Sequence, residues 1–193
     1  MDYDFVAEIE NPNKDFGASE IVYDLKLFNG SNTEILKEGG VFYILPNQKK
    51  FLILSALTTD REVSRVEFDI KNASWQKLDS LDGMSLIVRQ EKYTETGSWS
   101  TISAGIFNDS DFDFGIVDID VVLFNSKDEI VAVGRSDIRT FLAKTERHFE
   151  VKWPFEFSDK MARFEIHPLT NLFENYNFIK SYGSPIEKFQ EYR

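Results

Sequence analysis

Apolar and polar residues alternate along much of the chain with a period of two. The stretch 117–124 places four apolar residues on one face and two acids on the other: Val117, Ile119, Val121 and Leu123 against Asp118 and Asp120. Successive side chains of an extended strand point to opposite faces, so this pattern predicts a half-buried antiparallel β-strand. The same alternation is found at residues 3–10, 23–27 and 65–71. No window keeps a 3.6-residue period over three helical turns.

The strand pattern occurs twice in the chain. Ile9–Asn11 corresponds to Ile106–Asn108 at an offset of 97, and Leu25–Asn29 corresponds to Val121–Asn125 at an offset of 96. Two further matches have an offset of 98: Phe51–Ile53 with Phe149–Val151, and Arg65–Phe68 with Arg163–Ile166. The matches keep their order and nearly their spacing, which indicates an internal duplication.

Turn-forming sequences separate the predicted strands: NPN, NGSN, LPNQ and NSKDE. Short strands with regular turns predict an all-β chain of two tandem immunoglobulin-like or fibronectin III-like antiparallel β-sandwiches, with a short C-terminal tail. We place the boundary between the sandwiches near Leu78–Gly83. The predicted domains are residues 1–80, residues 81–170 and an aromatic tail at 171–193.

The two copies are not expected to be complete to the same degree. The second begins with a strand-like segment, Met84–Tyr93, whose counterpart at an offset of 97 would fall before Met1. We therefore expect the first sandwich to lack its opening strand. An uncovered edge strand invites pairing with a partner protein or another copy.

The tail is rich in aromatic residues. We expect it to pack on the second domain or in the interdomain groove, and the alternative is a docking segment for a partner protein. Its aromatic residues are Phe173, Tyr176, Phe178, Tyr182, Phe189 and Tyr192.

Composition excludes several classes of function. The net charge of −11 argues against a nucleic-acid binder, which needs a cationic face, and against an anionic membrane surface. The chain has no cysteine, which excludes disulfides, thiolate zinc sites and a cysteine nucleophile. No apolar run approaches the roughly 20 residues that span a bilayer, so we expect no membrane insertion by this segment. The acidic N-terminus does not have the character of a secretory signal.

The stretch NDSDFDFG, Asn108–Gly115, is the strongest candidate for metal chemistry. Asp109, Asp111 and Asp113 match the first, third and fifth ligands of an EF-hand calcium loop. The glycine comes one residue late, position 12 is an aspartate on a predicted strand, and the flanks are strands rather than helices. We interpret the stretch as a corner in which Asn and Asp bond to local backbone, with weak calcium binding as the alternative.

Other polar residues are candidates for catalysis. Asp118 and Asp120 share a strand face, as paired carboxylates would in a glycosidase, but nothing predicts a cleft around them, and we interpret them as a solvated face. His148 and His167 lie on separate predicted strands, with no nucleophile motif beside them. We interpret them as isolated surface histidines. The adjacent Gly39 and Gly40 indicate a turn or bulge.

The three tryptophans lie near the ends of predicted strands. We expect Trp75, Trp99 and Trp153 to pack in a core or between domains. The alternative is an exposed aromatic face that binds sugars.

Several of these motifs resemble known families. The sequences IENPN and YDLKLFNGS resemble the water-stress-and-hypersensitive-response domain of late embryogenesis abundant proteins, and VVLFN at Val121–Asn125 is similar to the FxLYD domain. The whole chain, with NPN, YILPN, SDFDF and WPF, resembles uncharacterised membrane-anchored proteins of candidate-phylum bacteria. These resemblances imply β-sandwich folds and an extracytoplasmic location behind an N-terminal anchor. They imply no catalytic residue.

The sequence therefore predicts a non-catalytic module without a cofactor that acts as a spacer, scaffold or protein-binding domain. A protein partner is expected at the open edge strand or at the tail. The alternatives are a carbohydrate-binding module, a carboxylate-based hydrolase, and a stress-protection role implied by the plant-like motifs.

Overall fold

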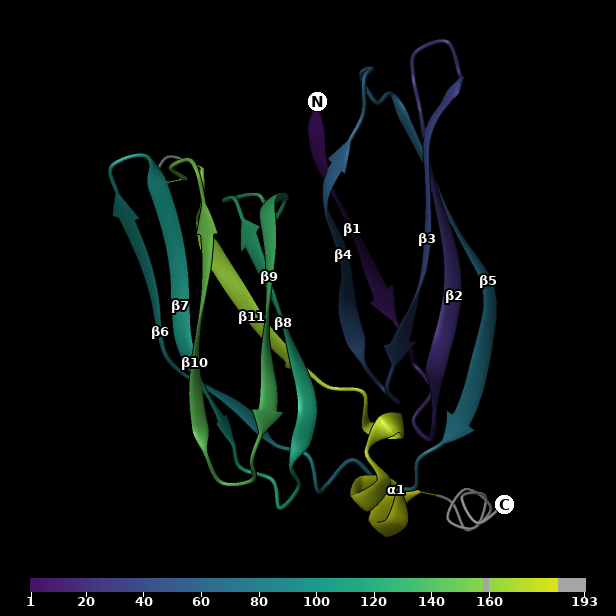
Figure 1. Cartoon of the computed structure of the whole chain (residues 1–193), viewed down its shortest axis with the longest axis vertical. Helices are drawn as coiled ribbons and strands as arrows, with labels where there is room; N and C mark the ends of the chain where they lie inside the picture. Colours follow the sequence, from purple (N-terminus) through teal and green to yellow (C-terminus); the bar gives the residue numbers. More distant parts are fainter. Residues whose placement is uncertain (158–159, 184–193) are drawn as a thin grey trace. The chain divides into compact units, whose positions relative to one another are not determined.

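The structure is a computed structural model and describes residues 1–157 and 160–183. These residues form an all-β, sandwich-like chain with one short α-helix. They divide into two compact units (Figure 1). Unit 1 contains Met1–Asp79, Asn171–Glu174 and Gly183, and unit 2 contains Ser80–Thr170 and Asn175–Tyr182.

Unit 1 has two antiparallel sheets. The first is three-stranded in the order β3-β2-β5, and the second pairs β1 with β4 (Figure 1). The strands are β1 (Asp2–Glu10), β2 (Phe16–Phe28), β3 (Glu34–Ile44), β4 (Lys49–Thr58) and β5 (Arg65–Lys77).

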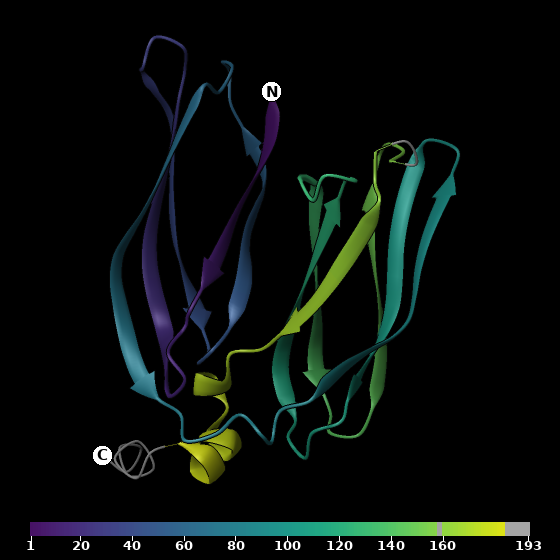
Figure 2. The same ribbon diagram turned by 180° about the vertical axis from the view of Figure 1, so that it is seen from behind.

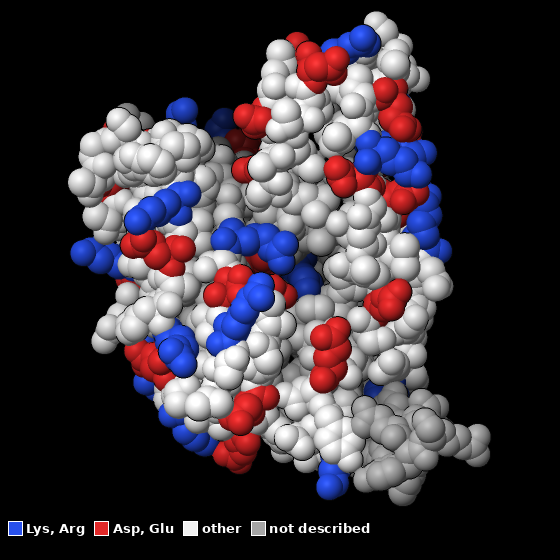
Figure 3. Space-filling model, in the orientation of Figure 1, with Lys and Arg blue, Asp and Glu red and all other residues white. Residues whose placement is uncertain are grey.

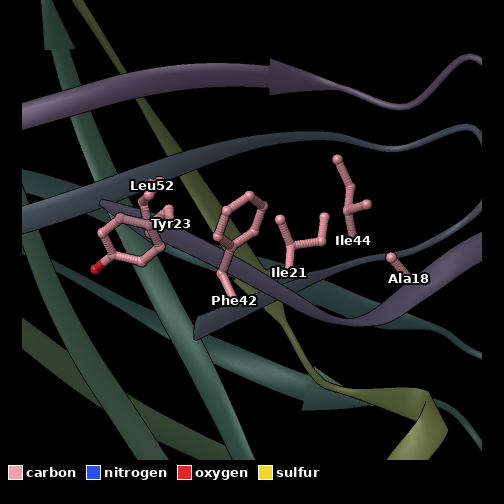
Figure 4. Packing of buried hydrophobic residues seen from close by; sticks show 6 residues of the cluster. All are labelled: Ala18, Ile21, Tyr23, Phe42, Ile44 and Leu52. Atoms are coloured by element: carbon pink, nitrogen blue, oxygen red, sulfur yellow. The ribbon is translucent and has the colours of Figure 1, made fainter. Parts of the chain in front are cut away.

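The core of unit 1 lies between these two sheets. It contains alternate residues of β2, β3 and β4, which the strand period places on the inward faces. Figure 4 shows six of them packed together: Ala18, Ile21, Tyr23, Phe42, Ile44 and Leu52. The apolar side of β1 is only partly buried against this core, at Ala7 and Ile9.

Unit 2 has two three-stranded antiparallel sheets, in the orders β10-β7-β6 and β11-β8-β9. Figure 2 shows the same strands from behind, with β6 beside β7. The strands are β6 (Leu86–Thr96), β7 (Trp99–Asn108), β8 (Phe114–Phe124), β9 (Ile130–Phe141), β10 (Glu146–Trp153) and β11 (Arg163–Leu169).

The side chain of Trp153 links the two sheets of unit 2. Trp153 is 6% exposed, and its Nε1 donates a hydrogen bond to the carbonyl oxygen of Val133 at 2.9 Å. Its ring lies over Gly134, where an added Cβ would be 2.8 Å from Trp153 Cζ2 and 2.5 Å from Val151 Cγ1. A glycine is therefore required at this position by the close approach of the indole.

Strand pairing follows one register in the two units. In unit 1, Ile9 lies opposite Lys50 and Phe5 opposite Leu54. In unit 2, Ile106 lies opposite Arg147 and Ile102 opposite Val151, which is the same pairing with 97 added to every number. The predicted offset of 98 for Phe51–Ile53 is therefore wrong by one residue. Leu52, not Phe51, takes the position of Phe149, because the inward face and not the residue type decides the match.

The hairpin after β2 and the hairpin after β8 are also built alike. Asn32 and Asp128 occupy the left-handed region, with φ of 58° and 62°. Each accepts a hydrogen bond from an arginine Nε at 3.0 Å, Arg65 in unit 1 and Arg163 in unit 2. Each guanidinium also lies 3.8 Å from the ring centroid of the last phenylalanine of β2 or β8.

One strand breaks the correspondence between the units. β1 to β5 match β7 to β11 in order and pairing, but β6 has no counterpart among the described residues of unit 1. In unit 2, β6 pairs with β7 and also contacts β11 of the opposite sheet. The corresponding edge of unit 1, along β1, carries no strand within the described part of the chain.

The C-terminal segment contributes to both units. A 3₁₀ turn at Leu172–Glu174 belongs to unit 1, and helix α1 (Tyr176–Tyr182) belongs to unit 2. Phe178 is fully buried, and its ring centroid lies 5.3 Å from that of Phe112. The two remaining aromatics of the tail, Phe189 and Tyr192, lie outside the described residues.

The described residues contain no helix long and apolar enough to cross a membrane.

Candidate functional site

The acidic stretch 108–115 forms a corner held by a buried asparagine. Asn108 is fully buried, and its Nδ2 donates to the carbonyl oxygens of Phe112 at 2.8 Å, Leu142 at 3.2 Å and Phe141 at 3.3 Å. Its Oδ1 accepts the N–H of Ser110 at 3.1 Å. One side chain thus satisfies backbone groups from two separate loops, which fixes the path of the chain.

The same corner occurs in unit 1. Asn11 is 3% exposed, and its Nδ2 donates to the carbonyl oxygens of Phe16 at 2.7 Å and Leu45 at 2.9 Å. Its Oδ1 accepts the N–H of Asn13 at 3.1 Å. Asn11 and Asn108 are equivalent residues in the duplication, so the asparagine belongs to the architecture of both units.

In the described structure, a lysine side chain is the cation that contacts the acidic residues of this corner. Lys144 Nζ lies 3.2 Å from Asp111 Oδ1 and 3.4 Å from Asp109 Oδ1. The hydrogen bond to Asp111 raises the pKa of Lys144. The third predicted calcium ligand, Asp113, instead accepts the N–H of Ala143 at 2.7 Å. Across residues 1–157 and 160–183, no three acids or histidines come together as a metal site.

The paired acids of β8 differ from the prediction. The side chain of Asp120 is 3% exposed, so the interpretation of Asp118 and Asp120 as a solvated face is wrong for Asp120. Arg135 lies directly opposite on β9, with its Nε 3.2 Å from Asp120 and its Nη2 3.6 Å from Asp118. An arginine that neutralises a carboxylate offsets part of the cost of burying it.

Each histidine lies beside a glutamate of its own strand. His167 Nε2 is 2.9 Å from Glu165 Oε2, and the exposed His148 is 3.6 Å from Glu146. Burial opposes ionisation of Glu165, but hydrogen bonds from Arg163 and His167 outweigh it and lower the pKa of this carboxyl. Acidic and basic side chains are interspersed over the face of the molecule that Figure 3 shows.

The tryptophans divide into one core residue and two surface residues. Trp153 packs in the core of unit 2, as predicted. The prediction is wrong for Trp75 and Trp99, which are 51% and 52% exposed. The β6–β7 hairpin explains the position of Trp99: the strands are joined by Gly97 and Ser98, Gly97 has a φ of +64°, and Trp99 comes directly after this tight turn.

A hollow of about 700 Å³ lies on the outer face of the sheet β10-β7-β6. The strand register arranges its lining in rows that run across the strands. One row is Lys92, Ser103 and Glu150, the next is Thr94, Thr101 and Lys152, and the last is Thr96 and Trp99.

This face combines one aromatic ring with polar groups at fixed spacing. Four hydroxyl side chains each offer one donor and two acceptor positions, and Trp99 closes the row at the hairpin end. Glu150 and Lys152 form an ion pair at 2.6 Å and are each about half exposed. The arrangement suits a ligand that has both a flat apolar surface and many hydroxyl groups.

The sequence predicts Trp99 as part of an alternative sugar-binding aromatic face but not the rows of hydroxyl side chains beside it. The alternation of apolar and polar residues in β6 and β7 was a usable signal, because it places Thr94, Thr101 and Ser103 on the polar side of these strands. The missing information was the pairing of β7 with β6 and β10, which brings rows from three strands together and depends on the tertiary fold.

The similarity of this chain to known proteins is weak. No protein-family model and no curated protein sequence matches the chain. One similar solved structure is a glycosyl hydrolase family 2 member from Bacteroides cellulosilyticus, with 7% identity and a TM-score of 0.31 over 86% of this chain. Another is Bacteroides uniformis beta-glucuronidase 2, with 10% identity and a TM-score of 0.24 over 87% of this chain. The chain spans 26% and 22% of their lengths.

Proposed function

We propose that this chain is a non-catalytic β-sandwich module that serves as a scaffold and binds a carbohydrate on the outer face of β6, β7 and β10. The observation that carries the proposal is the half-exposed ring of Trp99 at the end of a hollow lined by threonine and serine. The C–H face of a sugar ring packs on an aromatic ring, and its hydroxyls bond to polar side chains beside it.

A binding role fits the acids of unit 2 better than a hydrolytic one. A glycosidase uses one carboxylic acid with a raised pKa and a second carboxylate across a cleft. In this chain Asp120 is ion-paired with Arg135, while Asp109 and Asp111 share Lys144. These acids of unit 2 therefore serve as partners of basic side chains of the chain itself.

Titration with soluble polysaccharides tests the carbohydrate proposal. We expect a glucan, xylan or mannan to change the tryptophan emission, and Trp99→Ala to weaken binding at least about tenfold, as the loss of an aromatic anchor does. Thr101→Val keeps the shape but removes a hydroxyl, and should weaken binding by about threefold to tenfold.

Trp75→Ala is the matched control, because Trp75 is equally exposed but lies in unit 1. It should leave polysaccharide affinity within about twofold. Equal affinity of Trp99→Ala and the unaltered chain would contradict the proposal, as would a complete absence of binding across the panel.

The scaffold role and an extracytoplasmic, membrane-anchored location are proposed from the resemblance of the sequence motifs. Their test is the reading frame that encodes the chain: an apolar anchor segment ahead of the sandwiches supports them. Fractionation of the producing cell that places the protein in the cytosol contradicts them.

A further inference from the structure

Strand β1 forms one edge of the two-stranded sheet of unit 1. Among the described residues its partner is β4 (Figures 1 and 2). The N–H of Asn11 donates to the carbonyl oxygen of Gln48, on the β4 side. Backbone groups alternate in direction along a strand, so the N–H and C=O groups of Val6, Glu8 and Glu10 point to the other edge.

The opposite sheet also leaves apolar surface uncovered on this flank. Val66 and Ile70 lie beside the core residues Leu27 and Tyr23, on the inward face of β5, yet they are 45% and 54% exposed. Their counterparts in unit 2, Phe164 and Pro168, are only partly exposed, and there β6 contacts β11. Within the described part of the chain, unit 1 thus leaves a backbone edge and apolar side chains uncovered at the place where unit 2 has strand β6.

Unit 2 shows the register that a strand would take at this edge. Val88 lies opposite Ile106 and Tyr93 opposite Ile102, with the chains antiparallel. The equivalent residues of β1 are Ile9 and Phe5, both inward-facing and only partly buried. A strand at the open edge would therefore place apolar side chains opposite these two residues.

The outward face of β1 is acidic where the face of β7 is not. Glu8 and Glu10 occupy the positions of Gly105 and Phe107, and both are exposed, with Lys49 of β4 opposite Glu10 and 2.9 Å from Glu8 as the single basic neighbour of the two acids on the paired side. Arg89 of β6 lies opposite Gly105, so a basic residue at the same place on a new strand would lie opposite Glu8. Opposite charges on directly facing residues stabilise a strand pair.

We propose that the open edge of β1 binds an extended segment of a partner protein, antiparallel to β1, in which apolar residues alternate with lysine or arginine. Main-chain hydrogen bonds to Val6, Glu8 and Glu10 hold the segment. Its apolar side chains cover Ile9, Phe5 and the exposed residues of β5, and its basic side chains face the two glutamates. This site is independent of the carbohydrate face.

A synthetic peptide with the sequence of Leu86–Thr96 and the change Ile87→Lys is the probe, because it places a basic residue opposite each glutamate and apolar residues opposite Phe5 and Ile9. We expect it to bind the full chain in a fluorescence anisotropy titration and to shift the amide NMR signals of Val6, Glu8 and Glu10. The same peptide with Ile87→Glu and Arg89→Glu, which places acids opposite Glu10 and Glu8, should bind at least about tenfold more weakly because of charge repulsion.

Two substitutions of Glu8 test the proposed site, one at the backbone N–H together with the charge and one at the charge alone. Glu8→Pro removes an N–H that points away from β4, so the β1–β4 pairing is kept while peptide affinity falls by about tenfold or more. Glu8→Lys should weaken peptide binding to a similar degree. Glu38→Lys makes an equal charge change on β3 and should leave the peptide affinity within about twofold. Amide exchange of Ala7 and Ile9 reports whether each variant keeps β1 folded.

Other occupants of the edge give different results. A dimer that forms with rising concentration, excludes the peptide and is lost in Glu8→Pro identifies a second copy of the chain and overturns the proposal. Exclusion of the peptide by a longer natural form of the chain identifies its own additional segment and also overturns it. Equal binding by Glu8→Pro, or none by the unaltered chain, does the same. Polysaccharide binding in these variants is a separate readout and tests only the carbohydrate proposal.

Discussion

Strands β1 and β7 occupy the same place in the two units but have different surroundings. Ile102 and Ile106 of β7 are fully buried, because β6 and β10 pair with the two edges of this strand. Phe5 and Ile9 of β1 face the core in the same way and remain partly exposed, with β4 on one edge. One sequence pattern thus gives two degrees of burial, and the neighbouring strand makes the difference.

The features that the units share lie at the corners, and the features that differ lie on the flanks. Asn11 and Asn108 make the same backbone bonds, and Arg65 and Arg163 contact equivalent turn residues. The added strand β6 buries the flank of β7 and also creates the outer face with Trp99. A duplicated fold can therefore keep its turns while each copy gains a different surface.

The largest expected effect comes from one substitution at equivalent positions of the two strands. Ile106→Ala removes a fully buried side chain and should lower the free energy of unfolding by about 3–4 kcal/mol. Ile9→Ala removes a side chain that is still partly in contact with water, and should cost about half as much. Denaturant unfolding measures the loss, and amide exchange assigns it to the strand concerned.

Equal losses for the two isoleucines would show that the edge of β1 is covered in solution. In that case, addition of the strand peptide should have no effect on Ile9→Ala. With an open edge, saturating peptide should bring the cost of Ile9→Ala closer to that of Ile106→Ala, because Ile9 becomes buried.

The corner asparagines should behave alike, in contrast to the isoleucines. Asn108→Ala and Asn11→Ala each leave buried carbonyl oxygens without a donor, and should each cost about 2 kcal/mol. The same denaturation and exchange experiments apply. If Asn108→Ala were costly and Asn11→Ala neutral, the two corners would not be structurally equivalent.

The smallest effect is expected at the acidic corner, which unit 1 does not share. Lys144→Ala should leave the midpoint of denaturant unfolding nearly unchanged, because the lysine and both aspartates are well exposed to solvent. Millimolar calcium should leave the Tm of the unaltered chain unchanged, since the ammonium group of Lys144 already lies between Asp109 and Asp111 and Asp113 is bonded to backbone. A clear calcium-dependent rise in Tm would favour the metal-binding alternative.

The fold could be predicted because local and tertiary signals agree along these strands. The alternation from Val117 to Leu123 predicts a strand wherever one face is buried, and the turn residues after Phe28 and Phe124 specify where the strands reverse. The offset of Phe51–Ile53 was assigned by residue type, and the correct match required knowledge of which face was inward. Helix α1, with seven residues, is too short for a three-turn periodicity to reveal it.

The candidate site could not be predicted, because it depends on contacts between distant strands. Lys144 lies 33 residues beyond Asp111 in the chain, so no local spacing shows that it occupies the acidic corner. The burial of Asp120 and the exposure of Trp75 and Trp99 likewise depend on what lies next to each strand. A sequence pattern indicates which face of a strand a side chain occupies, but it does not indicate which other strands cover that face.

The placement of the tryptophans gives the molecule native optical reporters. Trp75 is the tryptophan of unit 1, whereas Trp99 and Trp153 belong to unit 2 and differ in their access to water. A soluble quencher will therefore reach two indoles and spare the third, and loss of the shielded signal will mark the melting of unit 2. Because the chain has no cysteine, a single introduced thiol would add a dye at any chosen position without competition.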